Sequence, residues 1–201
     1  MVLGAVALLA AGRSSAEDRH FFLDPSRSVL TIRTGKAGLF AFAGHEHLIR
    51  VSSVRGKIVA NAAALEASSV SLTIDAGSLT VQPEGEPAED VAKVQARMRS
   101  SELLDVVRFP DILFQSVAVS GRAEGEATFD IRVSGDLSVH GVKSRIALPI
   151  RVEMGLGSLT ATGRTVLRQT TFGLTPVSVG GVVKVRDEVV IEYKFVGMSN
   201  P

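Results

Sequence analysis

Apolar and polar side chains alternate along most of the chain from residue 21 onward, and this alternation constrains the fold more than any other feature. In residues 129–139, apolar side chains take nearly every second position, and Asp130, Arg132 and Ser134 separate them. A period of two places alternate side chains on opposite faces of a β-strand. The same pattern recurs in residues 30–33, 70–75, 145–151 and 189–195. The chain is therefore predicted to consist mostly of strands with one apolar face each.

Short clusters of Gly, Ser, Ala and acidic residues separate these runs, as in residues 120–127 and 155–158. Such residues accept turn geometry, so neighbouring strands are predicted to form antiparallel hairpins, with a meander as the simplest topology. Strands with one apolar face have to bury those faces together, either in a sandwich or in a sheet closed into a barrel. The fold class is all-β, and the periodicity leaves both architectures open.

One segment breaks the alternation and predicts a short helix at about residues 90–98. It follows the Pro- and Glu-containing stretch of residues 82–90, and it contains Ala, Lys, Gln and Arg, which favour helices. Asp90 is the expected N-cap, and Val91, Val94 and Met98 share one helical face. We expect this helix to lie over a mouth of the β-structure.

Size and charge narrow the classes of function. A chain of 201 residues that is 45% hydrophobic is long enough for one folded domain with a sizeable core. Its net charge of +1 gives no electrostatic reason to expect a nucleic acid or an anionic membrane surface as partner. The absence of cysteine excludes disulfides and thiolate chemistry.

The N-terminus predicts export. Residues 2–11 form an uncharged apolar run of the length of a signal-peptide core, which is too short to span a bilayer. Ser14 and Ala16 provide small side chains at the spacing that a signal peptidase accepts, so residues 1–16 are predicted to be a signal peptide, although no basic residue precedes Arg13. The alternative is a buried N-terminal helix. The mature protein is expected to be periplasmic or secreted, without stable membrane insertion, and to consist of one domain over residues 20–197.

The sequence gives no indication of an enzyme. It contains no Gly-x-Ser-x-Gly elbow, no zincin helix motif and no glycine-rich phosphate loop. Paired carboxylates such as Glu84 and Glu86 lie in segments with turn-forming composition, where nothing is expected to raise a carboxyl pKa for acid catalysis.

The sharpest alternative chemistry lies in the sequence Gly-His-Glu-His of residues 44–47. On an extended strand, His45 and His47 point the same way, and such a pair can bind zinc or copper if a third ligand approaches. His140 is the remaining internal candidate. The other interpretations are that the two histidines meet the polar head of a lipid or quinone, or that they hydrogen-bond to backbone at the mouth of the β-structure.

Five segments, taken in order, carry a resemblance to a known family. They are FLDPSRSVLTIRT (22–34), GHEHLIRVSSVRGKI (44–58), MRSSELLDVVRFPDILFQS (98–116), FDIRVSGDLSVHGVKSRIALPI (129–150) and RQTTFGL (168–174). Together they resemble the YceI-like family, which shows an Asp-x-x-x-Ser opening, a Pro-x-Ile-x-Phe-x-Ser core and a late Arg followed by Phe-Gly. The resemblance covers about residues 21–197.

The resemblance implies a lipocalin-like closed antiparallel barrel, exported to the periplasm, whose lumen binds a polyisoprenoid, an isoprenoid quinone, a fatty amide or a related amphiphile. It also implies a homodimer. The expected bound molecule is this lipid or quinone, with no other cofactor. The alternative to a ligand chamber is a packed core, since an apolar strand face is more often core than pocket.

The residues predicted to contact the ligand are the apolar, inward-facing members of the strands, together with the two histidines of the Gly-His-Glu-His segment and one aromatic near the end of the chain. They are Leu30, Ile32, Phe42, His45, His47, Leu72, Ile74, Phe114, Ile131, Val133, Leu148, Ile150, Phe172 and Ile191.

Overall fold

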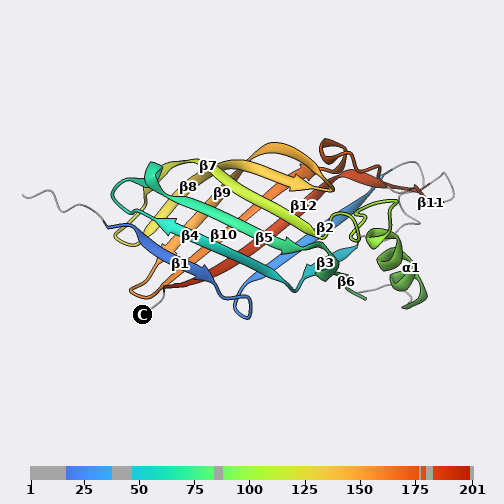
Figure 1. Cartoon of the computed structure of the whole chain (residues 1–201), viewed down its shortest axis with the longest axis horizontal. Coiled ribbons are helices and arrows are strands. Elements are labelled where there is room, and N and C mark those ends of the chain that lie inside the picture. Colours follow the sequence, from blue (N-terminus) through green and yellow to red (C-terminus); the bar gives the residue numbers. More distant parts are fainter. Residues whose placement is uncertain (1–16, 38–46, 84–87, 177, 180–182, 200–201) are drawn as a thin grey trace, which may run out of the picture.

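The computed structural model describes residues 17–37, 47–83, 88–176, 178–179 and 183–199, and they form an elongated closed β-barrel (Figure 1). All strand pairs are antiparallel, and the all-β, lipocalin-like class predicted from the sequence is confirmed. The strands are β1 (Arg19–Leu23), β2 (Val29–Ala37), β3 (Leu48–Val51), β4 (Val54–Ala60), β5 (Ser69–Asp75), β6 (Leu79–Val81), β7 (Asp111–Ala123), β8 (Thr128–Val139), β9 (Val142–Met154), β10 (Ser158–Arg168), β11 (Ser178–Val179) and β12 (Val183–Ser199).

The ring closes between the first and the last strand. The order β1-β4-β5-β7-β8-β9-β10-β12 runs around the barrel, and β1 pairs with β12 through Phe21 opposite Ser199 and Leu23 opposite Gly197. Closure pairs the backbone groups of β1 and β12, which would otherwise form exposed edges. β12 is long enough to pair with β10 along one side and with both β2 and β1 along the other.

The first three strands of the meander are each interrupted near the middle, so β1 continues as β2, β3 as β4, and β5 as β6. The first break follows from Asp24 and Pro25. The carboxylate of Asp24 accepts hydrogen bonds from the backbone nitrogen and the hydroxyl of Ser26, and these hold its pKa below the ordinary value. The Ser28 hydroxyl accepts a hydrogen bond from the Val196 amide of β12, and this bond takes the place of the backbone pairing that is interrupted here.

The other two breaks lie next to each other. Asp75 caps the short 3-10 turn η3 (Ala76–Ser78) by accepting from the Gly77 nitrogen, and the Ser78 hydroxyl accepts from the Ser53 nitrogen between β3 and β4. The breaks divide this wall into β1, β4 and β5 on one side and β2, β3 and β6 on the other. Only the first group continues into β7, because β5 pairs with β7 and β6 does not.

The free edge of β6 is covered by the helix α1 (Ala88–Arg99) rather than by a strand. The side-chain amide of Gln95 donates to the Leu79 carbonyl (2.9 Å) and accepts from the Val81 nitrogen (2.7 Å), as a neighbouring strand would. The guanidinium of Arg99 donates to the Gly77 carbonyl (2.6 Å). The helix therefore satisfies backbone groups along the outer edge of β6 by side-chain hydrogen bonds, and we call this edge the seam.

The predicted helix is confirmed, with a correction at its start. It begins at Ala88, so Asp90 lies inside the first turn and is not the N-cap. There its carboxylate interacts favourably with the positive end of the helix dipole. Met98 is buried and Val91 and Val94 pack against the core, so the predicted face is the inner one. Figure 1 shows α1 at one end of the barrel, beside β6 and β3.

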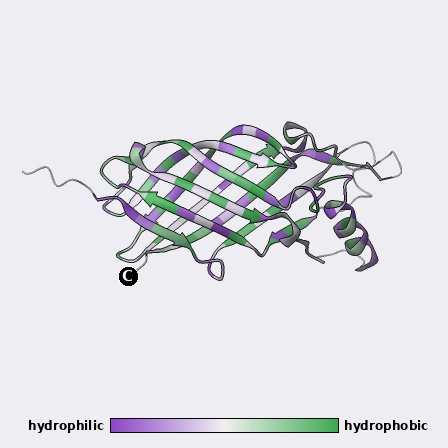
Figure 2. Cartoon of the chain, viewed as in Figure 1, coloured by the Kyte–Doolittle hydropathy of each residue, from purple (hydrophilic) through white to green (hydrophobic). Residues whose placement is uncertain are grey.

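Alternation along the strands separates the lumen from the outer surface (Figure 2). In β8, for example, Phe129, Val133 and Leu137 are buried and Arg132 is exposed. The predicted turn at residues 120–127 is shorter than expected, because β7 extends to Ala123. No helix in the described part of the chain is long and apolar enough to cross a membrane. The predicted signal peptide at residues 1–16 lies outside the described residues.

Replacing Gln95 by Leu should weaken the seam. The Val81 amide would lose its partner, and the Leu79 carbonyl would keep only its longer hydrogen bond from Arg99 (3.4 Å). An unsatisfied buried group costs about 1–3 kcal/mol. We expect urea unfolding to show a loss of about that size and hydrogen exchange at the Val81 amide to accelerate. The control is Gln115→Leu, which makes the same change on the exposed face of β7; equal losses in both variants would contradict the assignment.

Candidate functional site

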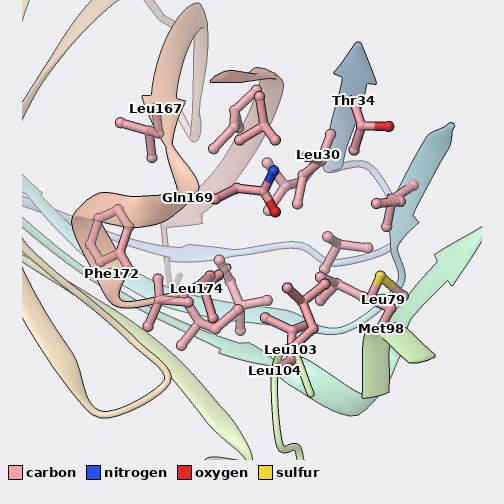
Figure 3. A pocket seen from close by; sticks show the side chains of 18 of the residues that line it. Leu30, Thr34, Leu79, Met98, Leu103, Leu104, Leu167, Gln169, Phe172 and Leu174 are labelled. Carbon is pink, nitrogen blue, oxygen red and sulfur yellow. The ribbon is translucent and has the colours of Figure 1, made fainter. Parts of the chain in front are cut away.

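The barrel encloses a cavity of about 660 Å³ at the end covered by α1. Volumes of this size are typical of sites for small organic ligands. Apolar side chains from the strands make its walls, and Leu103 and Leu104 of the segment after α1 contribute from the mouth (Figure 3). We call this cavity the front chamber. Its apolar lining includes Leu30, Ile32, Ile49, Val51, Leu72, Ile74, Leu79, Val94, Met98, Ile112, Phe114, Leu137, Val139, Leu148, Leu167, Phe172, Leu174, Val185, Val189 and Ile191.

A second, smaller cavity of about 90 Å³ lies toward the other end of the barrel, and we call it the rear chamber. Its walls include Phe129, Ile131, Val133 and Ile150. Five residues line both chambers and therefore form the floor that separates them. They are Leu72, Phe114, Leu148, Tyr193 and Phe195.

Aromatic rings dominate this floor. Tyr193 and Phe195 occupy successive inward-facing positions of β12, and their rings stack with centroids 5.5 Å apart. The Tyr193 hydroxyl donates to the Pro149 carbonyl of β9 (3.0 Å). Burial raises the pKa of this phenol to about 12. Because the neutral phenol is fixed at both its ring and its hydroxyl, it is a rigid part of the wall.

Glycines make room for two of the three aromatic floor residues. Gly163 of β10 lies opposite Tyr193 of β12. A Cβ atom at Gly163 would lie 2.4 Å from the Tyr193 hydroxyl oxygen. At Gly135 of β8, a Cβ would lie 2.5 Å from the ring of Phe114. The tip of each ring thus lies against bare backbone, and each glycine is required by a close approach.

Charged groups line the front chamber only at its mouth, and they are paired. Lys93 contacts Asp90 (3.3 Å) on α1, and Arg97 contacts Glu102 (2.9 Å). Arg168, at the end of β10, contacts Glu188 of β12 (3.4 Å). Within the described residues, every lysine or arginine that lines the chamber therefore has a carboxylate partner, and these residues offer no unpaired positive charge to an anionic head group.

Gln169 places a polar group inside the mouth. It begins the short 3-10 turn η4 (Gln169–Phe172), and its amide nitrogen donates to the Arg186 carbonyl (2.8 Å). A carbonyl can only accept, so the nitrogen has to face Arg186 and the amide oxygen has to face the other way. Figure 3 shows the Gln169 amide projecting into the space between Leu30 and Leu103. The oxygen is placed to accept a hydrogen bond from a guest.

The structure locates the predicted ligand residues in both chambers. Leu30, Ile32, His47, Ile74, Phe172 and Ile191 line the front chamber; Ile131, Val133 and Ile150 line the rear one; Leu72, Phe114 and Leu148 belong to the floor. Phe42 and His45 lie outside the described residues. Contact of these residues with a ligand stays a prediction.

The histidine motif is only partly described. His47 lines the mouth, and its backbone nitrogen donates to the Thr34 hydroxyl (3.3 Å). His140 lies in the turn between β8 and β9 with a positive φ of 51°, and its ring packs edge-on against Phe109 with centroids 4.7 Å apart. Within the described ranges, no group of three His, Cys, Asp or Glu residues is arranged to hold a metal ion. The pair of His45 and His47 is not tested by this observation.

Several lining residues were not predicted. Tyr193 and Phe195 lie on the same alternating face as Ile191, so the period of two already placed them inward. Leu103, Leu104 and Gln169 lie in segments without periodicity, where neither composition nor spacing signals a position at the mouth.

The closed antiparallel barrel, with an apolar chamber and a polar mouth, places the chain in the class of lipocalin-like barrels. The family model for the YceI-like domain matches residues 21–196. The chain therefore belongs to the YceI-like family, and membership supports a lipid-binding barrel at the level of the family.

Solved structures show the same fold at low identity. BcnA of Burkholderia cenocepacia matches with a TM-score of 0.67 at 17% identity, over 87% of this chain and 98% of that protein. The YCEI protein of Campylobacter jejuni matches with a TM-score of 0.56 at 14% identity, over 76% of this chain and 84% of that protein. A search of curated proteins gave no significant match.

Replacing Gly163 by Ala should destabilise the floor. The new methyl group would have to displace the Tyr193 hydroxyl or the Pro149 carbonyl, which is 2.5 Å from its position. Overpacking of this kind costs about 1–3 kcal/mol, measurable by urea unfolding. Gly125→Ala is the matched control, because nothing lies within 4 Å of its Cβ position. A loss at Gly125 as large as at Gly163 would refute the packing argument.

The phenol of Tyr193 should titrate near pH 12, and the sequence makes this measurable because the chain contains one tyrosine. Ultraviolet absorbance should give a single midpoint there in the folded protein and one near 10 in guanidinium. Because the folded-state pKa is the higher one, stability is fully present below about pH 10 and falls as the pH rises toward 12. A folded-state midpoint near 10 would show that the ring is accessible to water.

Proposed function

We propose that the protein binds a long apolar amphiphile in the front chamber and sequesters or carries it in the periplasm. The observation that carries this proposal is the distribution of polarity: the walls of a chamber of about 660 Å³ are apolar, and the charged lining groups are confined to its mouth. Such a site buries a hydrocarbon chain and leaves its head at the polar end. Polyisoprenoids, isoprenoid quinones and fatty amides have this form.

Burial of the chain supplies the driving force. Removing apolar surface from water contributes roughly 25 cal/mol per Å², while ordering a flexible chain opposes binding. The wall residues have few polar atoms to satisfy, so the fit of chain length and width to the chamber governs affinity. The paired charges at the mouth favour a neutral head over a phosphate or carboxylate.

The proposed role is binding and not catalysis. The cavity described above is lined mainly by side chains without acid, base or nucleophilic groups, and its charged members are paired at the mouth. Export through the predicted signal peptide and assembly as a homodimer belong to the same proposal. The alternative, a metal-binding protein that uses His45 and His47, stays a prediction that the following experiment also tests.

Native mass spectrometry of protein purified from its expressing cells, followed by solvent extraction, tests the proposal. We expect a stoichiometric lipid that leaves with the solvent and that analysis identifies as a neutral long-chain molecule. Protein that carries no lipid, and that takes up none from a mixture of isoprenoid alcohols and quinones, would overturn it. Retention of zinc or copper, lost in the variant with His45→Ala and His47→Ala, would favour the metal alternative.

The amide oxygen of Gln169, which faces away from the Arg186 carbonyl, favours a head that donates a hydrogen bond, such as an alcohol or an amide. Gln169→Leu should therefore weaken binding of a long 1-alkanol by about 2- to 10-fold, as expected for one lost hydrogen bond. Binding of the corresponding methyl ether, which has no donor, should change little, and calorimetric titration compares the two. An equal loss for both ligands would mean that Gln169 acts only on the shape of the mouth.

A further inference from the structure

We infer that the aromatic floor of Tyr193, Phe195 and Phe114 sets an upper limit to the chain length that the barrel accepts. The inference rests on the proposed function and concerns a property that the proposal leaves open. It predicts that affinity stops rising at a defined chain length in a series of ligands that differ only in length.

The floor crosses the lumen between two apolar spaces. Its residues come from four strands, with Leu72 on β5, Phe114 on β7, Leu148 on β9 and the stacked pair on β12. Each of these residues contacts the front chamber on one side and the rear chamber on the other. A chain that fills the front chamber therefore ends against this layer, and further growth has to pass through it.

Three contacts resist displacement of the layer. The Tyr193 hydroxyl donates to the Pro149 carbonyl, and the Tyr193 ring stacks on that of Phe195. Phe114 and Tyr193 each fill the space beside a glycine, so the tip of each ring is in close contact with the wall. The three rings are 4%, 7% and 8% exposed for Phe114, Tyr193 and Phe195, respectively. Rotating any of them out of the lumen would disrupt buried packing.

The space behind the floor makes the limit testable. The rear chamber is apolar and of about 90 Å³, and its lining includes Phe129 and Val133 together with the floor residues. If a floor ring is removed, the two chambers merge and a longer chain can extend into the rear. If a rear ring such as Phe129 is removed instead, the rear chamber grows but the floor stays closed.

The experiment measures the affinity of 1-alkanols of increasing length, by displacement of a fluorescent fatty probe, for the delipidated protein. For the wild type, affinity should rise roughly fourfold with each added methylene, as burial of one CH2 implies, and then stop rising at a defined length. Phe195→Ala should move this plateau to longer chains. Phe129→Ala, which removes an equally buried phenyl ring from the rear chamber alone, should leave it unchanged.

Both substitutions remove core volume, so Phe195→Leu and Phe129→Leu serve as a milder pair if either alanine variant fails to fold. The inference would be overturned if the Phe195 and Phe129 variants reached their plateaus at the same chain length, or if affinity for the wild type kept rising without a plateau. Either result would leave the binding function intact. Failure of every alkanol to bind the wild type would instead reject the proposed function, and the inference with it.

Discussion

The pairing of β1 with β12 is the constraint on which the rest of the structure depends. It joins the two ends of the described chain, and it turns a sheet with one apolar face into a tube with an apolar inside. Without it, the inner faces of the strands would have to be covered by a second layer, and no chamber would remain. The length of β12 is what permits the closure, because this strand pairs with β10 on one side and with β2 and then β1 on the other.

Within the tube, the width of the lumen depends on small residues as much as on large ones. Gly163 and Gly135 let Tyr193 and Phe114 lie against the backbone, so the rings form a thin partition and leave a chamber on either side. At the mouth, the breaks in the first three strands leave β6 unpaired with β7, and α1 covers the edge of β6 there. Polar groups gather at this end because the interrupted backbone and the helix bring them there.

The sequence predicted the strands and their inner faces because alternation is a local property of the chain. Ile131, Val133 and Ile191 were placed inward for this reason, and the helix was recognised where alternation failed. The depth of a residue along the barrel was not predictable, since it depends on the stagger between strands far apart in sequence. That is why Ile131 and Val133 line the rear chamber while Ile191 lines the front one, and why the floor was not foreseen. Gln169, Leu103 and Leu104 reach the mouth from irregular segments that only the tertiary fold positions.

The seam at β6 has a consequence for how evenly the wall is held. A long backbone ladder such as that of β8 with β9 spreads its hydrogen bonds over many residues, so no single side chain controls it. The outer edge of β6 is held instead by the amide of Gln95 and the guanidinium of Arg99, two side chains of one helix. A substitution at either position can therefore alter this edge of the barrel while the backbone ladders stay in place.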